Sequence, residues 1–409
     1  MSNDTQPEIR FPGFTDDWEQ RKLKDVTERV RSNDGRMDLP TLTMSASSGW
    51  LDQKDRFSGD ISGKEKKNYT LLKKGELSYN HGNSKLAKYG VVFSLTNYEE
   101  ALVPRVYHSF KALENTSADF IEYMFSTKLP DRELGKLVSS GARMDGLLNI
   151  NYDDFMNIHI SIPNYEEQIL MSSFFRKLDE IIALHQRKLD LLKETKKGFL
   201  QKMFPKNGAK VPEIRFPGFT EDWEERKLQE VLRERNNQQP QSMEYPLVSF
   251  TVENGVTPKT DRYEREQLVV GDKSSKKYKV TVLNDIVYNP ANLKFGAISR
   301  NKYGNAVFSP IYITFLVNND VTTPEFIEMF VTRNDFIKRA LKYQQGTVYE
   351  RQSVSPTDLL AMNVYLPGKS EQEKIGSFFQ QLDETIALHQ RKLDLLKETK
   401  KGFLQKMFV

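Results

Sequence analysis

The chain has 409 residues, with 60 Lys and Arg against 56 Asp and Glu, and its net charge of +4 is too even to identify a partner. Its length allows two or three domains of about 100–200 residues each, and 38% hydrophobic residues indicate folded cores. The absence of cysteine excludes disulfides, thiolate metal sites and cysteine nucleophiles. We expect a cytoplasmic protein without a membrane span, because the sequence shows neither a secretory signal pattern nor an apolar run of about 20 residues.

Two segments of the chain occur twice. Residues 7–23 (PEIRFPGFTDDWEQRKL) differ from residues 212–228 at two of 17 positions, and residues 178–204 differ from residues 382–408 at one of 27 positions. The offsets are 205 and 204 residues, so one unit of about 204 residues is used twice. Between these matched ends the two halves diverge. The pattern predicts two near-identical supports that carry two different heads.

The first head, residues 1–163, shows short strand-like runs separated by turn signals. Residues 89–95, 102–107 and 157–162 are predicted strands, and residues 118–126 are a predicted helix. Basic residues gather in the middle of this head, interleaved with asparagine and tyrosine. These cations are Lys64, Lys66, Lys67, Lys73, Lys74, Lys85 and Lys88.

Residues 164–204 predict a long spacer helix. The expected helix runs from Tyr165 to Met203. From Leu178 to Met203 apolar residues recur every three or four positions, with His185 and Lys196 as polar interruptions, which is typical of a coiled coil. Such a helix would be about 58 Å long at 1.5 Å per residue, longer than a packed core needs. The expected seam and partner-docking residues are Leu178, Ile182, Leu189, Leu192, Leu382, Ile386, Leu393 and Leu396.

The second half repeats this order. Residues 205–367 hold a short linker and the second head, with predicted strands at 278–282, 306–315 (interrupted by Pro310) and 363–366 and a predicted helix at 323–339. Residues 368–409 are the second spacer helix. Because the linker is short, two helices that pack together must run antiparallel, and the chain end should return close to Pro7. The predicted fold is α+β: two heads and an antiparallel coiled coil in a pseudo-twofold tandem repeat.

One register would align the polar interruptions of the two helices. It places Leu178 opposite Met407 and His185 opposite Lys400, as a buried polar layer that fixes the alignment. The alternative is that these polar residues lie at the edge of the seam and are solvated.

Several residues in the divergent parts are candidates for contact with DNA. Lysine and backbone amides suit phosphates, whereas Asn, Gln, Arg and Ser suit base edges. Arg143 and Arg351 are of interest because they lie on glycine loops, and a solvated surface role is the alternative for each lysine. The candidates are Asn80, Asn83, Lys85 and Arg143 in the first head, and Asn289, Asn292, Lys294, Arg300, Thr347, Tyr349 and Arg351 in the second.

Signals for catalysis are missing. The five histidines show no metal-ligand spacing with carboxylates. The run Gly368-Lys369-Ser370 resembles the end of a phosphate loop, but Asn363 stands where the first glycine should be. Residues 289–292 (NPAN) resemble an amino-methyltransferase motif without its second proline and aromatic residue. We therefore expect no catalytic residue, metal site or bound cofactor in this chain.

The doubled order of variable head and repeated helix carries a family resemblance. Each helix opens with Glu-Gln (Glu167-Gln168 and Glu371-Gln372), and each head closes with a glycine loop and a strand that ends at a proline. This layout resembles the specificity subunit of a type I restriction-modification system, over essentially the whole chain.

The resemblance implies a function. Each head would be a target recognition domain that reads one half of a bipartite, asymmetric site in double-stranded DNA, and the coiled coil would dock two methyltransferase subunits. Those partners would use S-adenosylmethionine to methylate adenine at N6, and restriction (motor) subunits would use ATP and Mg²⁺ for cleavage. The alternatives are a scaffold whose heads bind two different proteins, and an autonomous DNA enzyme.

Overall fold

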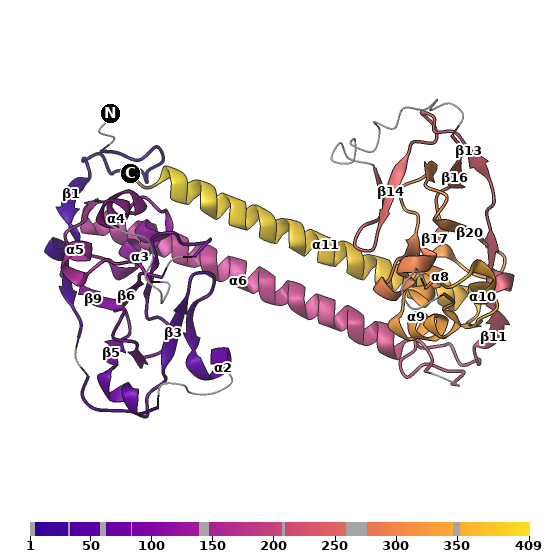
Figure 1. The fold of residues 1–409 in the computed structure, drawn as a ribbon, viewed down its shortest axis with the longest axis horizontal. Coiled ribbons are helices and arrows are strands. Elements are labelled where there is room, and N and C mark those ends of the chain that lie inside the picture. Colours follow the sequence, from indigo (N-terminus) through magenta and orange to yellow (C-terminus); the bar gives the residue numbers. More distant parts are fainter. Residues whose placement is uncertain are drawn as a thin grey trace. The chain divides into compact units, whose positions relative to one another are not determined.

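The computed structural model describes residues 5–31, 33–57, 63–82, 84–138, 147–206, 209–258, 276–346 and 352–409. The chain divides into two units, which are residues 1–187 with 391–409 (the first unit) and residues 188–390 (the second unit). Each unit holds one head and part of both long helices, α6 (Tyr165–Lys202) and α11 (Lys369–Lys406), as Figure 1 shows. The division between the units therefore falls inside both helices.

The first head is a small α+β fold. Its central sheet has the antiparallel order β2-β9-β6-β7, and β5-β8, β3-β4 and β1-β10 form antiparallel pairs. Its elements are β1 (Glu19–Lys22), α1 (Leu23–Val26), β2 (Thr27–Arg29), β3 (Leu42–Ser45), β4 (Gly49–Asp52), α2 (Gln53–Phe57), η1 (Gly63–Asn68), β5 (Thr70–Lys73), β6 (Leu77–Asn80), β7 (Val91–Ser94), β8 (Glu100–Val103), β9 (His108–Ala112), α3 (Ala118–Ser126), α4 (Asp131–Leu137), α5 (Tyr152–Met156) and β10 (His159–Ile162).

The second head repeats this topology although its sequence differs. Its sheet order β12-β20-β17-β18 corresponds to β2-β9-β6-β7, strand by strand in chain order. Its elements are β11 (Glu224–Lys227), α7 (Leu228–Val231), β12 (Leu232–Glu234), β13 (Gln238–Gln239), β14 (Val248–Thr251), β15 (Gly255–Pro258), β16 (Tyr278–Thr281), β17 (Ile286–Tyr288), η3 (Pro290–Phe295), β18 (Ile298–Arg300), β19 (Ala306–Phe308), β20 (Ile313–Val317), α8 (Pro324–Val331), α9 (Asn334–Ala340), η4 (Leu341–Tyr343), α10 (Pro356–Leu360) and β21 (Asn363–Leu366).

Two predicted elements are broken in the structure. The helix expected over residues 323–339 is two helices, α8 and α9, because Arg333 leaves the helical conformation with ψ 141° and places its guanidinium 4.7 Å from the Phe204 ring centre. The strand run predicted over residues 306–315, with Pro310 as an interruption, is two strands, β19 and β20, which lie in different sheets. The predicted bounds of α3 and β21 are confirmed.

Each unit closes its core with the end of a long helix segment that belongs to the other copy of the repeat. In the first unit, Phe408 at the end of α11 packs edge to face against Trp18, with 6.1 Å between ring centres. In the second unit, Phe204 at the end of α6 packs against Trp223 at 5.9 Å. All four residues belong to the repeated segments, so the repetition in sequence is a repetition of one packing arrangement.

The repeated segments also meet through matched backbone hydrogen bonds. The amide of Ile9 donates to the carbonyl of Lys406 (2.9 Å), and the amide of Ile214 donates to the carbonyl of Lys202 (2.9 Å). The chain end therefore returns to the segment that begins at Pro7, as predicted.

A buried ion pair fastens the start of each long helix. Arg10 donates two hydrogen bonds of 2.8 Å to the carboxylate of Glu167, and Arg215 donates two of 2.7 Å to Glu371. The two glutamate side chains are only 1% exposed. The glutamate of each Glu-Gln pair thus joins its helix to the repeated N-terminal segment.

The glutamine of each pair joins the helix to the head. The Gln168 side chain accepts a hydrogen bond from the Ser117 amide and donates one to the Pro163 carbonyl, both 2.9 Å. Gln372 accepts from the Thr323 amide at 3.1 Å in the same way. Ser117 and Thr323 cap the helices α3 and α8, so the glutamine fixes an equivalent helix start in each head.

Within each unit the two long helices pack antiparallel. In the first unit the Phe174 and Phe403 rings lie 5.1 Å apart, and in the second unit the Phe199 and Phe378 rings lie 5.1 Å apart. The start of one helix therefore lies against the end of the other, as connectivity required.

The predicted register of the helices is wrong. Lys400 pairs with Asp179, six residues before the expected His185, and six residues correspond to about 9 Å of helix. Lys196 likewise pairs with Asp383. The predicted register would have placed lysine against histidine, whereas the observed one gives each lysine an aspartate. No helix among the described residues is long and apolar enough to cross a bilayer.

Candidate nucleic-acid interface

One loop occupies the same place in both heads and carries most of the described candidate residues. Residues 80–87 read NHGNSKLA and begin with the last residue of β6, and residues 289–296 read NPANLKFG and follow the equivalent β17. Both place asparagine at the first and fourth positions, lysine at the sixth and a large apolar residue at the seventh. We refer to these two segments as the asparagine–lysine loops.

In the first head, Asn80 shapes the start of the loop. Its side-chain oxygen accepts a hydrogen bond from the Gly82 amide (3.0 Å), and its amide nitrogen lies 3.5 Å from the carbonyl oxygen of Met44 on β3. Gly90 closes the far side with φ +87°, where a Cβ atom would lie 2.4 Å from the Asn80 carbonyl oxygen. Lys85 is exposed on the loop held between these points.

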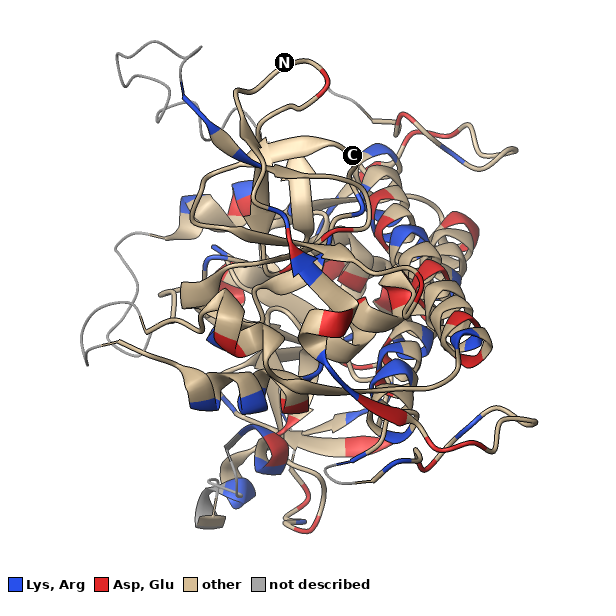
Figure 2. Cartoon of the chain, turned by 90° about the vertical axis from the view of Figure 1, so that its right-hand side faces the viewer, with Lys and Arg blue, Asp and Glu red and all other residues tan. Residues whose placement is uncertain are grey.

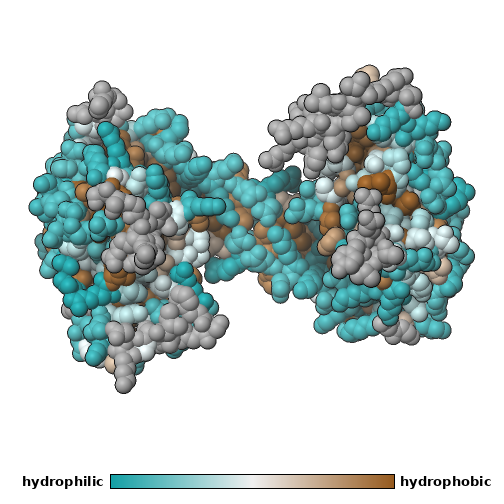
Figure 3. Space-filling model, viewed as in Figure 1, coloured by the Kyte–Doolittle hydropathy of each residue, from teal (hydrophilic) through white to brown (hydrophobic). Residues whose placement is uncertain are grey.

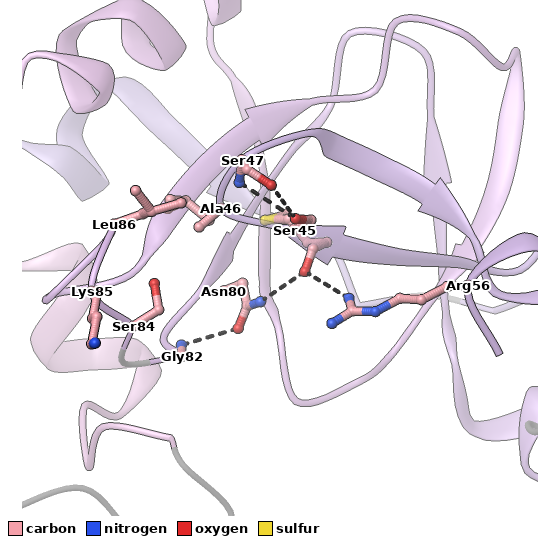
Figure 4. Close-up of a pocket in the computed structure, with 11 residues that line it drawn as sticks. Ser45, Ala46, Ser47, Arg56, Asn80, Gly82, Ser84, Lys85 and Leu86 are labelled. Carbon is pink, nitrogen blue, oxygen red and sulfur yellow. Dashed lines mark hydrogen bonds between the residues drawn. The ribbon is translucent and has the colours of Figure 1, made fainter. Parts of the chain in front are cut away.

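A polar pocket of about 430 Å³ opens between this loop and the turn that joins β3 to β4 (Figure 4). Three hydroxyls line it, from Ser45, Ser47 and Ser84, together with the side chains of Arg56 and Lys85. Hydroxyls, an amide and two cations are the groups that hold phosphate oxygens and base edges. The site is therefore suited to nucleic acid in its chemistry.

In the second head, the equivalent loop is a short 3₁₀ helix, η3. The Asn289 side chain caps it by accepting a hydrogen bond from the Ala291 amide (3.1 Å), and Gly296 ends it with φ +86°. Leu293 is fully buried beneath it. Asn292 and Lys294 are exposed, so the loop presents an amide and a cation from a fixed backbone.

Arg300 occupies a different environment from the other candidates. It lies on β18, and its guanidinium bonds the carboxylates of Glu325 and Glu328 and the side-chain oxygen of Asn284. The arginine side chain is 13% exposed. It connects the sheet to helix α8, away from the asparagine–lysine loop.

The remaining candidates divide into two groups. Asn83, Arg143, Thr347, Tyr349 and Arg351 lie outside the described residues. Of the predicted seam residues, Leu178, Leu189 and Leu393 are buried. The other five are partly buried, and they are Ile182, Leu192, Leu382, Ile386 and Leu396. Along the two long helices, Lys and Arg alternate with Asp and Glu (Figure 2).

Sequence reasoning missed the serines and Arg56 of the pocket, and it missed a stacked pair of histidines, of which His81 is buried. A signal existed for Arg56, because Asp-Arg-Phe at residues 55–57 matches Asp-Arg-Tyr at residues 261–263. The His81 ring nitrogens lie 2.7 and 3.1 Å from the carbonyl oxygens of Leu148 and Val106. His108 stacks on this ring, and burial lowers the pKa of His108 to about 4.

Among the described residues, no group of three or more His, Asp or Glu side chains is placed to hold a metal ion. Two heads of one topology, each with an exposed lysine on the same loop, define a double-headed binding protein on a matched helical support.

A protein-family model described as "Type I restriction modification DNA specificity domain" matches residues 15–194 and again residues 220–398. The chain belongs to this family.

Two specificity subunits are similar in sequence to most of this chain. It is 24% identical over 312 residues to the type I restriction enzyme MjaVIII specificity subunit of Methanocaldococcus jannaschii, covering 71% of this chain and 70% of that protein. It is 22% identical over 418 residues to the putative MjaX specificity subunit of the same organism, covering 95% and 92%. The S subunit structure from M. genitalium shares the fold, with a TM-score of 0.60, 11% identity and 99% coverage of both chains.

Proposed function

We propose that this chain is the sequence-recognition subunit of a type I restriction-modification complex, in which each head reads one half of a bipartite, asymmetric DNA site. The observation that carries the proposal is the doubled specificity domain with matched supports and divergent heads. Two identical heads would read two identical half-sites, as symmetric dimers do. Two heads of one topology with different loops suit two different half-sites.

The asparagine–lysine loops are the described surfaces that fit this role. Lys85 and Lys294 suit phosphate contacts, and Asn292 and the pocket serines suit base edges. Asn80 and Asn289 use their side-chain oxygens on the loop backbone, so we assign them to loop positioning. Asn83, Arg143, Thr347, Tyr349 and Arg351 remain proposed contacts on the basis of their sequence setting. Arg300 is assigned to holding the head together.

The long helices suit the docking of two copies of one partner. The first unit exposes Leu184 of α6 and Leu395 of α11, at 59% and 64%, and the second unit exposes the equivalent Leu388 and Leu191, at 45% and 67%. Figure 3 shows the apolar surface along the helices. Large exposed apolar residues on a helix commonly mark a protein interface. The same pair of leucines in each unit supports two identical binding sites.

By family resemblance we propose that these partners are two methyltransferase subunits, which bind S-adenosylmethionine and methylate adenine at N6. Restriction subunits that use ATP and Mg²⁺ would join the same complex. In this arrangement the chain itself contributes recognition and no catalytic group. A similar fold, with a TM-score of 0.50 and 13% identity, is found in a solved structure that concerns complex assembly and conformational transition of the type I R-M system.

Exchange of one head tests the proposal. Residues 24–177 would be replaced by the corresponding segment of another specificity subunit, which keeps Arg176 with the acidic residues of its own head. Methylated positions would then be mapped in cells that carry the partner subunits. We expect one half-site to change and the other to stay. The matched control exchanges residues 229–381 and should change only the other half-site; a change in both half-sites, or no sequence-selective methylation, would contradict the proposal.

A further inference from the structure

Both asparagine–lysine loops expose a large apolar side chain directly after the lysine. Leu86 is 69% exposed in the first head and Phe295 is 64% exposed in the second. The heads have diverged around them, and yet the apolar residue holds the seventh position in both loops. Figure 3 shows apolar surface in the region of β14 and β17 of the second unit.

The backbones beneath these side chains are fixed. In the second head the Gly296 amide donates to the Leu293 carbonyl (2.8 Å), and Leu293 anchors the loop in the core. In the first head Ser84 and Ala87 exchange two backbone hydrogen bonds of 3.1 and 3.2 Å, and Ala87 is 1% exposed. The exposed apolar groups are therefore held at defined positions next to the lysines.

Charge selects the kind of partner that this arrangement fits. Lys85 and Lys88 flank Leu86, and the Lys294 ammonium lies 5.1 Å from the Phe295 ring centre. A lysine followed by an exposed apolar side chain is complementary to a polyanion that carries apolar groups close to its charged backbone. The lysine would contact the charge, and the apolar side chain would contact the apolar group. In the major groove of DNA that apolar group is the 5-methyl of thymine.

We propose that Leu86 and Phe295 are specificity-determining residues, each of which packs against the methyl group of a thymine in the half-site that its own head reads. Lys85 and Lys294 contact the adjoining phosphates and hold the apolar tip in the groove. This inference rests on the proposed function and names a base that each head distinguishes. Burial of one methyl group corresponds to a loss of roughly fourfold in affinity when it is removed, or about 0.8 kcal/mol.

The test uses the complex of the full chain with its methyltransferase partners. The recognised sequence is first determined by selection from random DNA. Each thymine of the site is then replaced by deoxyuridine, which removes only the methyl group and requires no protein variant. We expect one thymine in each half-site to show a loss of roughly fourfold.

Variants connect each methyl group to its side chain. Phe295→Ala should make the complex insensitive to deoxyuridine at one thymine of one half-site, and Leu86→Ala should do so in the other. Lys294→Ala should leave the sequence preference intact and lower the salt slope of binding by about 1. Leu283→Ala and Leu113→Ala are matched controls, because Leu283 and Leu113 are 56% and 39% exposed and lie outside the loops; they should leave both half-sites unchanged.

Two kinds of failure are distinguishable. Selective DNA binding that ignores every deoxyuridine, or that is unchanged by both alanine variants, overturns this inference and leaves the proposed function standing. Loss of partner assembly in Phe295→Ala with normal DNA preference would assign the side chain to a protein contact and also overturns it. Absence of any sequence-selective binding by the unaltered complex removes the proposed function together with the inference.

Discussion

Replacement of Arg10 by methionine should strongly destabilise the first unit. Arg10 holds the carboxylate of Glu167 by two hydrogen bonds of 2.8 Å, and these side chains are 11% and 1% exposed. Removal of the arginine leaves a buried charge without its partner, which costs about 3–5 kcal/mol. That is a large part of the 5–15 kcal/mol of a typical domain. The exposed Arg21–Glu19 pair should contribute no more than about 1 kcal/mol.

A double-mutant cycle separates the pair from its parts. Arg10→Met and Glu167→Met should each destabilise the first unit, whereas the double variant should recover most of the loss, because an apolar pair of similar volume tolerates burial. Hydrogen exchange followed by mass spectrometry, combined with urea unfolding, assigns each loss to a unit. Arg21→Met is the surface control.

The duplication supplies an internal control for this prediction. Arg215→Met removes the equivalent pair with Glu371 and should weaken protection in the second unit by a similar amount. The reasoning is refuted if Arg10→Met costs less than about 1 kcal/mol, or if the double variant is as unstable as the two single losses added together.

Two further predictions concern the first head. Gly90→Ala should lower the free energy of unfolding by well over the roughly 1 kcal/mol expected for Gly13→Ala. The reason is that the added Cβ at Gly90 meets the Asn80 carbonyl oxygen at 2.4 Å, whereas that at Gly13 meets nothing within 4 Å. Urea unfolding of the two variants measures the difference, and equal losses of stability would contradict the prediction. Burial lowers the pKa of His108 to about 4, next to His81 and Arg29. The unfolded chain, with an ordinary histidine pKa of about 6.5, therefore binds the extra proton between these values, so stability should fall by about 3 kcal/mol as pH drops from 6.5 to 4. His108→Leu should remove that part of the pH dependence in urea titrations, and an unchanged slope would count against it.

The matched supports were predictable because their sequences, residues 7–23 and 178–204, occur a second time in the chain. A repeated Phe-Pro-Gly-Phe segment and a repeated helix identify the same packing unit, and the short linker fixes the helix direction. The register was not predictable, because an a/d pattern fits several alignments one heptad apart. The observed register is the one in which Asp179 pairs with Lys400 and Asp383 pairs with Lys196.

The heads were predictable only as α+β domains. Their shared topology depends on strand pairing between distant residues, such as Tyr79 with His108 and Tyr288 with Ile313, and only the tyrosine is the same in these two equivalent pairs. The asparagine–lysine loop leaves a pattern in both halves. In contrast, Ser45 and Ser47 of the pocket come from the β3–β4 turn, where the second head has Thr251 and Glu253. Arg300 was a candidate contact by composition, but two glutamates of α8 engage it.

The place where the repeat in the helices begins has a physical explanation. Arg176 of α6 bonds Asp119 and Glu122 of α3, so this part of the helix is fitted to its own head. Ser172 does the same through the Ser117 hydroxyl at 3.1 Å. Residues from Leu178 onward are identical in both copies except at position 181, although the Tyr123 hydroxyl of α3 still donates a hydrogen bond of 2.8 Å to Asp179. The divergent sequence thus covers the part of the helix that bonds its own head through Ser172 and Arg176.

The second unit meets the same electrostatic requirement in another way. Helix α8 carries Glu325 and Glu328 at the positions of Asp119 and Glu122, counted from the capping residue, but Gln380 stands where the first unit has Arg176. The cation comes instead from Arg300 on β18, inside the head. The two acidic residues need a positive partner in both units. In the first unit the long helix supplies it as Arg176, and in the second unit the head supplies it as Arg300. Divergence of a head therefore extends into the first turns of its helix, up to the position where the matched sequence begins.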